Sequence, residues 1–175
     1  AGIKPILGCE VYVAPNSRFD KELTGGDDRY YHLVLLAENN TGYANLMKIV
    51  SAGHVEGFYY KPRIDKDVLR AYSKGLICLS ACIAGELPVM LQQNNMEGAR
   101  RVVKEFINIF GKDNYFLEMQ DHEMSEEHKV NEALVQLAKE FDLDLVCTND
   151  LHYVRKEDWE GQDVLLCIQT TSTVD

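Results

Sequence analysis

The chain has 175 residues, of which 46% are hydrophobic and 26% charged, a composition typical of a globular protein and not of a disordered one. Its net charge of −10 argues against a domain that coats duplex DNA by phosphate contacts, because such domains are usually basic. The apolar runs are too short to span a bilayer, and the first residues lack the pattern of a secretory signal.

Apolar, β-prone segments predict strands at residues 6–13, 32–37, 76–80, 115–120 and 145–148. Helical periodicity predicts helices over 43–50, over 102–110 before Gly111, over 130–141 with Ser125 as N-cap, and from Lys156 onward. The polar, Gly-rich residues 16–29 predict an exposed loop or hairpin.

Strands that alternate with helices of this length imply crossover connections and a mainly parallel α/β sheet, either open or part of a β/α barrel. In both architectures ligands gather at the carboxyl ends of the strands. Neither an internal repeat nor a domain linker interrupts the 175 residues, so we expect a single domain over 1–175.

The last predicted strand is followed by Asp150 and His152, two residues apart. In an extended segment residues at this spacing project to the same side, and carboxylate and imidazole are both ligands of zinc, manganese or iron. The alternative is a surface D-x-H sequence that caps the next helix.

Three further side chains could bind a metal ion. Glu10 interrupts an apolar strand, so it should be bound to a metal, be paired with a basic side chain or lie at a strand end. His32 begins another apolar strand, where it could be a ligand or a core residue. Cys82 follows a strand before Ala84-Gly85, which permit a tight turn, and could bind metal, act as a nucleophile or only pack.

The segment FLEMQDHEMS places Glu118, Asp121 and His122 at the end of another predicted strand. Asp121 or Ser125 could cap the following helix, and Glu118 could face the core or a basic partner. A metal-competent residue at several strand ends is most simply explained by one shared site. The sequence has no G-x-x-x-x-G-K-[ST], G-x-G-x-x-G or G-x-S-x-G motif, so nucleotide hydrolysis, dinucleotide chemistry and serine hydrolysis have no support.

Five cysteines occur without C-x-x-C spacing, and most of them lie in apolar runs. This pattern favours buried free thiols in a reducing compartment, so we expect a cytoplasmic protein.

Long strings of the sequence resemble one family. They are GIKPILGCEVYVAP, SRFDK, YYHLVLLAENNTGYANLMKIVS, EGFYYKPRID, GLICLSACIAGE, DNYFLEMQDH and VCTNDLHYVRKED with VLLCIQT. The resemblance is to the polymerase-and-histidinol-phosphatase (PHP) domain, in the form found at the N-terminus of bacterial DNA polymerase III alpha subunits, which act in DNA replication. It runs over essentially the whole chain.

The resemblance implies a distorted (β/α)7 barrel, of which this chain would form a part, with up to three zinc or manganese ions at the carboxyl ends of the strands. It implies phosphoester hydrolysis and, where all ligands are retained, a 3′–5′ proofreading exonuclease. Alternatively, the domain is a non-catalytic platform for a separate exonuclease subunit. A free-standing histidinol-phosphate-type phosphatase is a third possibility, which the strings SRFDK, EGFYYKPRID and LLCIQT argue against.

Position by position, the resemblance implies metal ligands at Glu10, His32, Cys82, Asp150 and His152, with Asp150 and His152 also catalytic. Glu118 and His122 match the family's FLE…DH string and could support the ligands from behind.

The family's H-x-H and T-D-H-G segments are absent from this sequence, as are the polymerase domains, whose nucleotidyl transfer would use magnesium. We therefore expect a fragment of a PHP domain with an incomplete metal site and exposed sheet edges that could self-associate. Through its parent protein, the resemblance implies contacts with DNA and with other replicative subunits.

Overall fold

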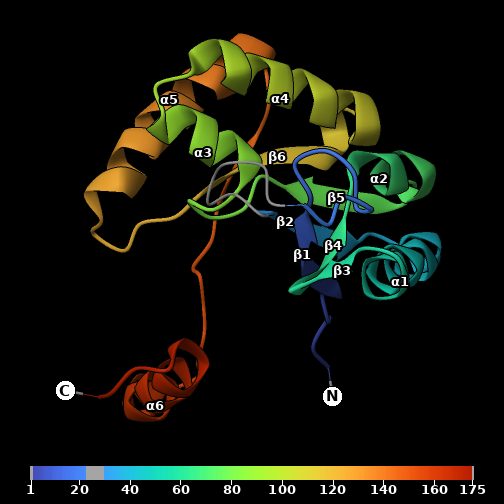
Figure 1. The fold of residues 1–175 in the computed structure, drawn as a ribbon. Helices are drawn as coiled ribbons and strands as arrows, with labels where there is room; N and C mark the ends of the chain where they lie inside the picture. The colour runs from blue at the N-terminus through green and yellow to red at the C-terminus, as the bar shows by residue number, and fades with distance from the viewer. Residues whose placement is uncertain (1, 23–29, 175) are drawn as a thin grey trace.

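A computed structural model describes residues 2–22 and 30–174, and in this part of the chain seven strands form one sheet (Figure 1). The strands are β1 (Gly8–Val13), β2 (Tyr31–Ala37), β3 (Phe58–Tyr59), β4 (Lys61–Ile64), β5 (Leu76–Leu79), β6 (Tyr115–Met119) and β7 (Leu145–Cys147). All five predicted strands are confirmed, with ends that differ by two residues at most.

The sheet has the order β3-β4-β1-β2-β5-β6-β7. Strand β1 is parallel to β4, and β5, β6 and β7 are parallel to one another. Strand β2 is antiparallel to both β1 and β5, and β3 is antiparallel to β4. Five strands therefore share one direction, which confirms a mainly parallel sheet. Among the described residues the sheet does not close into a barrel, because β3 and β7 remain as edges.

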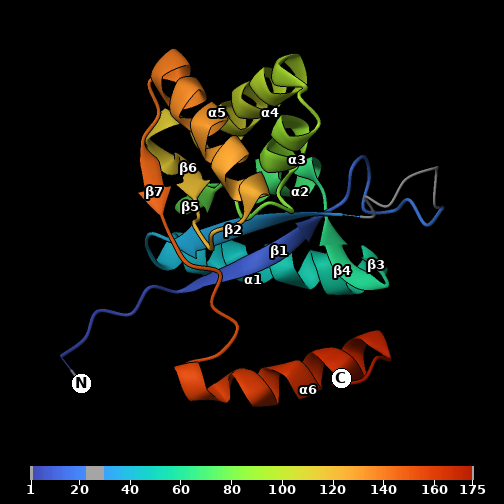
Figure 2. The same ribbon diagram turned by 90° about the vertical axis from the view of Figure 1, so that its left-hand side faces the viewer.

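Six α-helices accompany the described strands: α1 (Asn40–Val55), α2 (Lys66–Tyr72), α3 (Glu86–Gln92), α4 (Met96–Phe110), α5 (Ser125–Phe141) and α6 (Trp159–Thr170). Short 3-10 turns precede β6 (Lys112–Asn114) and α6 (Lys156–Asp158). Helices α3, α4 and α5 pack together beside β5 and β6, whereas α1 packs along β1, β2 and β4 (Figures 1 and 2).

Helix α4 shows how the periodicity creates the core. Its five predicted apolar positions are all buried, namely Val102, Val103, Phe106, Ile109 and Phe110. The Phe106 ring stacks on Tyr115 of β6, with centroids 5.4 Å apart, which fixes the helix on the sheet. Burial of a side chain of this size stabilises the fold by about 1.5–3 kcal/mol.

The predicted N-cap of α5 is wrong. Ser125 is the first helical residue, Met124 occupies the N-cap position, and no side chain caps the helix there. Asp121 does not cap the helix either, since its carboxylate accepts the backbone N–H of Glu123 at 3.1 Å. The turn is instead held by the Glu127 carboxylate from within the first turn of the helix, as described below.

The loop expected over 16–29 lies partly outside the described residues, because 23–29 are not among them. Most residues of the described part are exposed, as predicted, but the loop is anchored at Arg18. The Arg18 guanidinium contacts Glu56 at 2.6 Å and Asp65 at 3.0 Å, and its side chain is 17% exposed. Asp65 is also the N-cap of α2, so this ion pair fixes the loop against the helix start.

Strands β3 and β4 and helices α2 and α3 were not predicted from the periodicity. Strand β4 contains Lys61, Pro62 and Arg63, so its sequence lacks the alternation of apolar and polar residues that marks a strand. Arg63 is only 4% exposed, so a charged residue occupies a buried position of this strand. Helix α3 is one of two seven-residue helices, and Pro88 lies in its first turn.

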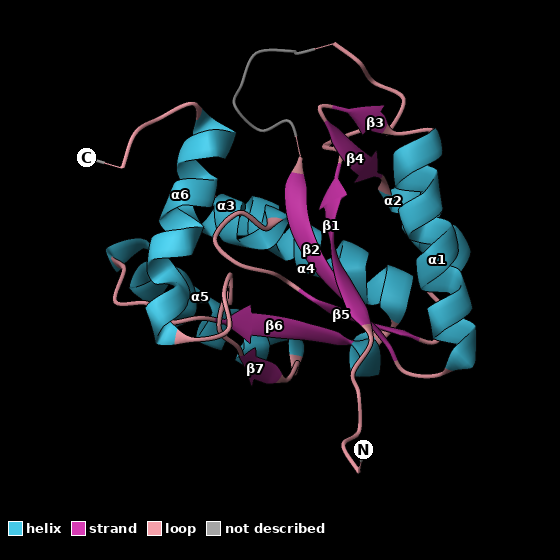
Figure 3. Cartoon of the chain, turned by 90° about the horizontal axis from the view of Figure 1, so that it is seen from below, coloured by secondary structure: helices cyan, strands magenta, loops and turns pink. Residues whose placement is uncertain are grey.

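Helix α6 stands apart from the rest of the molecule (Figures 1 and 2), although it overlaps α5 when the chain is seen from below (Figure 3). It confirms the predicted last helix, after a 3-10 turn at Lys156–Asp158, but none of its residues is buried. Its apolar side chains Val164, Leu165 and Ile168 are 47%, 61% and 73% exposed. None of the helices formed by the described residues is long and apolar enough to cross a membrane.

Candidate metal centre

Glu10 and His32 meet across the β1–β2 pair. Val11 and Val13 face the core, so Glu10 and Tyr12 face the opposite side of the sheet. His32 is paired with Tyr12 in the ladder, one step diagonally from Glu10. Its Nδ1 lies 2.9 Å from Glu10 Oε1, with side chains 24% and 40% exposed. His32 is therefore the partner of Glu10, although the Glu10 carboxylate is not buried as expected.

Cys82 reaches the same imidazole from the turn after β5. Its Sγ lies 3.6 Å from His32 Nδ1. The turn is fixed to β2, because His32 N–H donates to Ala84 O at 3.0 Å. Gly85 is required there, since a Cβ would lie 2.3 Å from Ser80 O. The predicted tight turn is confirmed, and it joins Glu10, His32 and Cys82 into one contact group.

The charges of this group are coupled. Contacts with Cys82 and then with Glu10 raise the pKa of His32 from 6.5 to about 10. The His32 contact in turn lowers the pKa of Glu10, with a smaller contribution from His152. Without a metal ion these contacts favour the charged form of the imidazole, with the Glu10 carboxylate as its counter-ion, and metal binding would have to displace the ring proton.

Glu118 is buried and hydrogen-bonded within the protein, so it is not placed as a metal ligand. It is 5% exposed, and its carboxylate accepts the N–H of Ala81 at 3.0 Å and the hydroxyl of Thr148 at 2.5 Å. Its own N–H donates to Ser80 Oγ at 2.8 Å. Burial of a carboxylate requires such partners. Glu118 thus connects the carboxyl ends of β5, β6 and β7 and positions the turn that carries Cys82.

Asp150 and His152 lie in an extended loop after β7, with His122 beside them. His152 Nδ1 is 3.9 Å from Asp150 Oδ1 and 2.9 Å from Asp150 O. The Asp150 N–H donates to His122 Nε2 at 3.4 Å. The expectation that Asp150 and His152 project together agrees with this geometry. Both are more exposed than His32, at 38% and 59%.

The donors thus form two groups: Glu10, His32 and Cys82 on the sheet, and His122, Asp150 and His152 at the loops after β6 and β7. Carboxylate, imidazole and thiolate suit zinc, and the oxygen and nitrogen donors also suit manganese. Within 2–22 and 30–174, however, no three such side chains converge closely enough to hold an ion. The chemistry of the donors fits a divalent metal, whereas their spacing is that of a partial site.

The sequence analysis missed Glu127, which is 3% exposed and contacts His122. The only signal for it was an acidic residue three positions into a helix, which is usually exposed. The expectation of mostly buried thiols is wrong, since Cys78 is the only buried cysteine and Cys147 is exposed.

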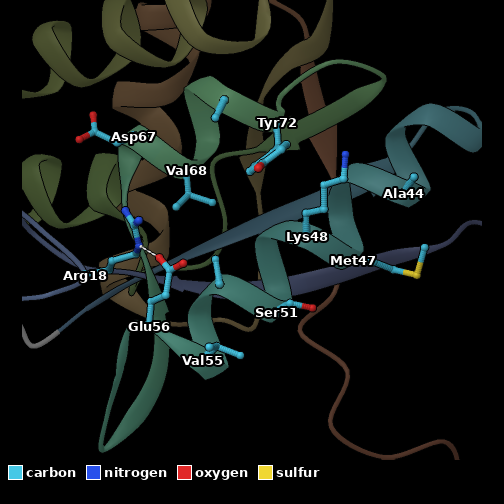
Figure 4. A pocket seen from close by; sticks show the side chains of 12 residues that line it. Arg18, Ala44, Met47, Lys48, Ser51, Val55, Glu56, Asp67, Val68 and Tyr72 are labelled. Atoms are coloured by element: carbon cyan, nitrogen blue, oxygen red, sulfur yellow. Dashed lines mark hydrogen bonds and ion pairs between the residues drawn. The ribbon is translucent and has the colours of Figure 1, made fainter.

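A groove of about 760 Å³ lies between α1 and α2 (Figure 4). Its lining includes Arg18, Met47, Lys48, Glu56 and Tyr72, and none of the metal-competent residues described above belongs to it. The groove is therefore separate from the donor groups.

Comparison with known proteins decides the family. Residues 1–122 match the PHP domain. The chain belongs to the PHP domain family. This PHP domain is 51% identical over 169 residues to the DNA polymerase III subunit alpha of Treponema pallidum, which covers 97% of the chain and 14% of that relative. It is 47% identical to the subunits alpha of Thermus aquaticus, over 99% of the chain and 14% of the relative, and of Borreliella burgdorferi, over 97% and 15%.

The chain is therefore homologous to a part of the DNA polymerase III subunits alpha. It spans only about a seventh of their length.

Proposed function

We propose that this PHP domain is part of a replicative DNA polymerase III alpha subunit and contributes a metal-dependent phosphoesterase site. In the intact domain the site would remove nucleotides from DNA 3′ ends as a 3′–5′ proofreading exonuclease. The contact group of Glu10, His32 and Cys82 is the observation that carries the proposal. Its residues come from three different segments, and each of them has a metal-binding side chain.

The position of this group in the sheet favours a functional site over an incidental ion pair. Because β2 runs opposite to its neighbours, its first residues lie at the edge where β1 and β5 end, and this edge is where α/β folds bind ligands. His152 lies near enough to influence the pKa of Glu10. Asp150 and His152 would thus complete the donors from the loop after β7.

A divalent ion, zinc or manganese, would neutralise the scissile phosphate and lower the pKa of a bound water. Glu10, His32, Cys82, Asp150 and His152 would hold it, and a thiolate at Cys82 would favour zinc over magnesium. Asp150, with an exposed carboxylate beside His152, is suited to orient the attacking water. Up to three ions in the intact domain remain part of the proposal.

The context of the site is the parent polymerase. We place it in the cytoplasm, in contact with DNA and with other replicative subunits, and with magnesium serving nucleotidyl transfer elsewhere in the parent protein.

The test is the metal content of the purified chain by elemental analysis, with the double variant Asp150→Ala, His152→Ala. The matched control is Asp67→Ala, His128→Ala, which removes the same residue types at positions 83% and 60% exposed outside the donor groups. Zinc or manganese near one ion per chain, lost in the first variant and kept in the control, is expected. Equal metal content in all three proteins would contradict the proposal.

A second function is a non-catalytic platform that binds the separate exonuclease subunit. The spacing of the donors favours it, since no three of those described converge on an ion. The uncovered apolar side chains of α6 offer a contact surface. A metal-free chain that still binds a purified exonuclease subunit, and loses that binding when residues 156–175 are removed, would support the platform over the phosphoesterase.

A further inference from the structure

His122 is held by a buried carboxylate. Its Nδ1 lies 2.7 Å from Glu127 Oε1, and its backbone N–H donates to Glu127 Oε2 at 2.6 Å. The Glu127 side chain is 3% exposed, whereas that of His122 is 38% exposed. The buried carboxylate therefore holds the ring through Nδ1, while the rest of the imidazole is partly exposed to solvent.

The second ring nitrogen faces the proposed site. Because Nδ1–H donates to Glu127, Nε2 carries the lone pair, and the N–H of Asp150 lies 3.4 Å from it. This contact is long for a hydrogen bond, so Nε2 has no strong partner there. An imidazole with Nδ1 on a carboxylate and Nε2 directed outward has the arrangement typical of metal-binding histidines.

A simpler role would be to fix the turn before α5. Glu127 also accepts the N–H of Met124, and Glu123 has a φ of +63°, so the turn needs such bonds. That role accounts for the backbone contacts of Glu127. It does not require an imidazole at position 122, since a backbone N–H is available from any residue except proline.

We propose that His122 is a metal ligand of the second donor group, acting through Nε2 beside Asp150 and His152, and that Glu127 is its positioning residue. The inference rests on the proposed function, because it concerns the same metal site. The ion would be a borderline divalent metal such as zinc, which accepts imidazole and carboxylate together.

The chain contains a comparison pair for this arrangement. His128 Nε2 lies 3.3 Å from Asp121 Oδ1, but these side chains are 60% and 69% exposed. This pair also joins a histidine to a carboxylate near the start of α5, but its carboxylate is exposed. His128→Ala is therefore the matched control for His122→Ala.

The test is calorimetric titration of the chain with Zn²⁺, together with the absorption spectrum of bound Co²⁺. We expect His122→Ala to weaken Zn²⁺ binding by about 100-fold and Glu127→Gln by about tenfold, within the range for ligand-supporting residues. Both should change the Co²⁺ spectrum, which a purely structural role would leave unaltered. His128→Ala should bind Zn²⁺ as the wild type does.

Circular dichroism of the metal-free variants checks that they fold. If His122→Ala does not fold, His122→Gln replaces it, because its amide can still donate to Glu127 while the imidazole is gone. If the wild type binds Zn²⁺, Asp150→Ala, His152→Ala loses it, and the His122 and Glu127 variants match His128→Ala, this inference is overturned and the proposed function stands. A wild type that binds no Zn²⁺ overturns both.

Discussion

The sheet with its packed helices and the segment after β7 differ in how their residues are held. Helices α4 and α5 bury whole apolar faces against β5 and β6, and Leu117, Leu134 and Leu137 have no exposed surface. Helix α6 is similar in length to many globular helices, yet none of its residues is fully buried. Isolated helices of about 12 residues are marginal in water, because packing supplies most of their stability.

This difference divides the candidate site. Glu10, His32 and Cys82 belong to the sheet and to a turn bonded to it, whereas Asp150 and His152 belong to the weakly held segment. One donor group is therefore preorganised by the fold, and the other depends on local contacts. The four predictions below test this division, from the largest expected effect to the smallest.

Leu134→Ala in α5 should lower the free energy of unfolding by about 2–5 kcal/mol, because it leaves a cavity in a fully buried position. Leu165→Ala in α6 makes the same chemical change at a side chain that is 61% exposed. It should alter the free energy of unfolding by less than about 0.5 kcal/mol. Urea denaturation of both variants gives the comparison. Similar losses in the two would show that α6 is packed in solution.

Glu118→Ala should lower the free energy of unfolding by about 1–3 kcal/mol, since it leaves the N–H of Ala81 without its buried acceptor. Glu118→Gln keeps one acceptor oxygen and should cost less. Thermal unfolding of the two variants in EDTA measures the effect without metal. Equal loss in both would mean that the charge, and not the hydrogen bonding, holds the strand ends together.

The Glu10–His32 pair should make stability depend on pH. The pKa of His32 is raised to about 10, so its contribution is fully present below pH 6.5 and is lost as pH rises through 10. The pKa of Glu10 is lowered, so its contribution is present above 4.5 and is lost as pH falls. Partly exposed pairs contribute about 1 kcal/mol or less. His32→Gln, unfolded in EDTA between pH 6 and 10, should show a flatter profile than the wild type; an unchanged slope would refute the coupling.

Removal of residues 156–175 should change the free energy of unfolding of the remaining chain by less than about 0.5 kcal/mol, because no residue of α6 is buried. The comparison of denaturation midpoints for the full and shortened chains is the measurement. A large loss in the free energy of unfolding would show that α6 packs against the sheet, and the contrast between the two regions would disappear.

The parts of the fold that could be predicted are those in which one period governs a long stretch. The stripes of α4 and α5 and the strands around Leu35, Leu79 and Leu117 follow this rule. Strands β3 and β4 could not be found this way, because they are short and because Arg63 is buried with the help of a contact to Asp20 O, which is distant in the sequence. The reversed direction of β2 was equally hidden, since periodicity does not encode the sense of a strand.

The candidate site shows the same limit. Side-chain type and strand position were sufficient to single out Glu10, His32 and Cys82, which the structure brings into contact. They were insufficient for Glu127, because its burial depends on the turn from His122 to Met124. Which donors approach each other is a property of the tertiary structure, and Asp150 illustrates it by lying beside His122 from a different strand end.

The hydrogen bonds of Glu118 have a consequence for hydrogen exchange. Ala81 lies in a turn with a φ of +67°, where amides usually exchange quickly, yet it is 2% exposed and its N–H is bound to a buried carboxylate. The same carboxylate holds Thr148 beyond the edge strand β7. Exchange at Ala81 therefore requires the contact between three strand ends to open. The protection of the Ala81 amide from exchange would therefore report on fraying of β7. Because Ala81 is next to Cys82, opening of this sheet edge and opening of the turn that carries Cys82 would be one event.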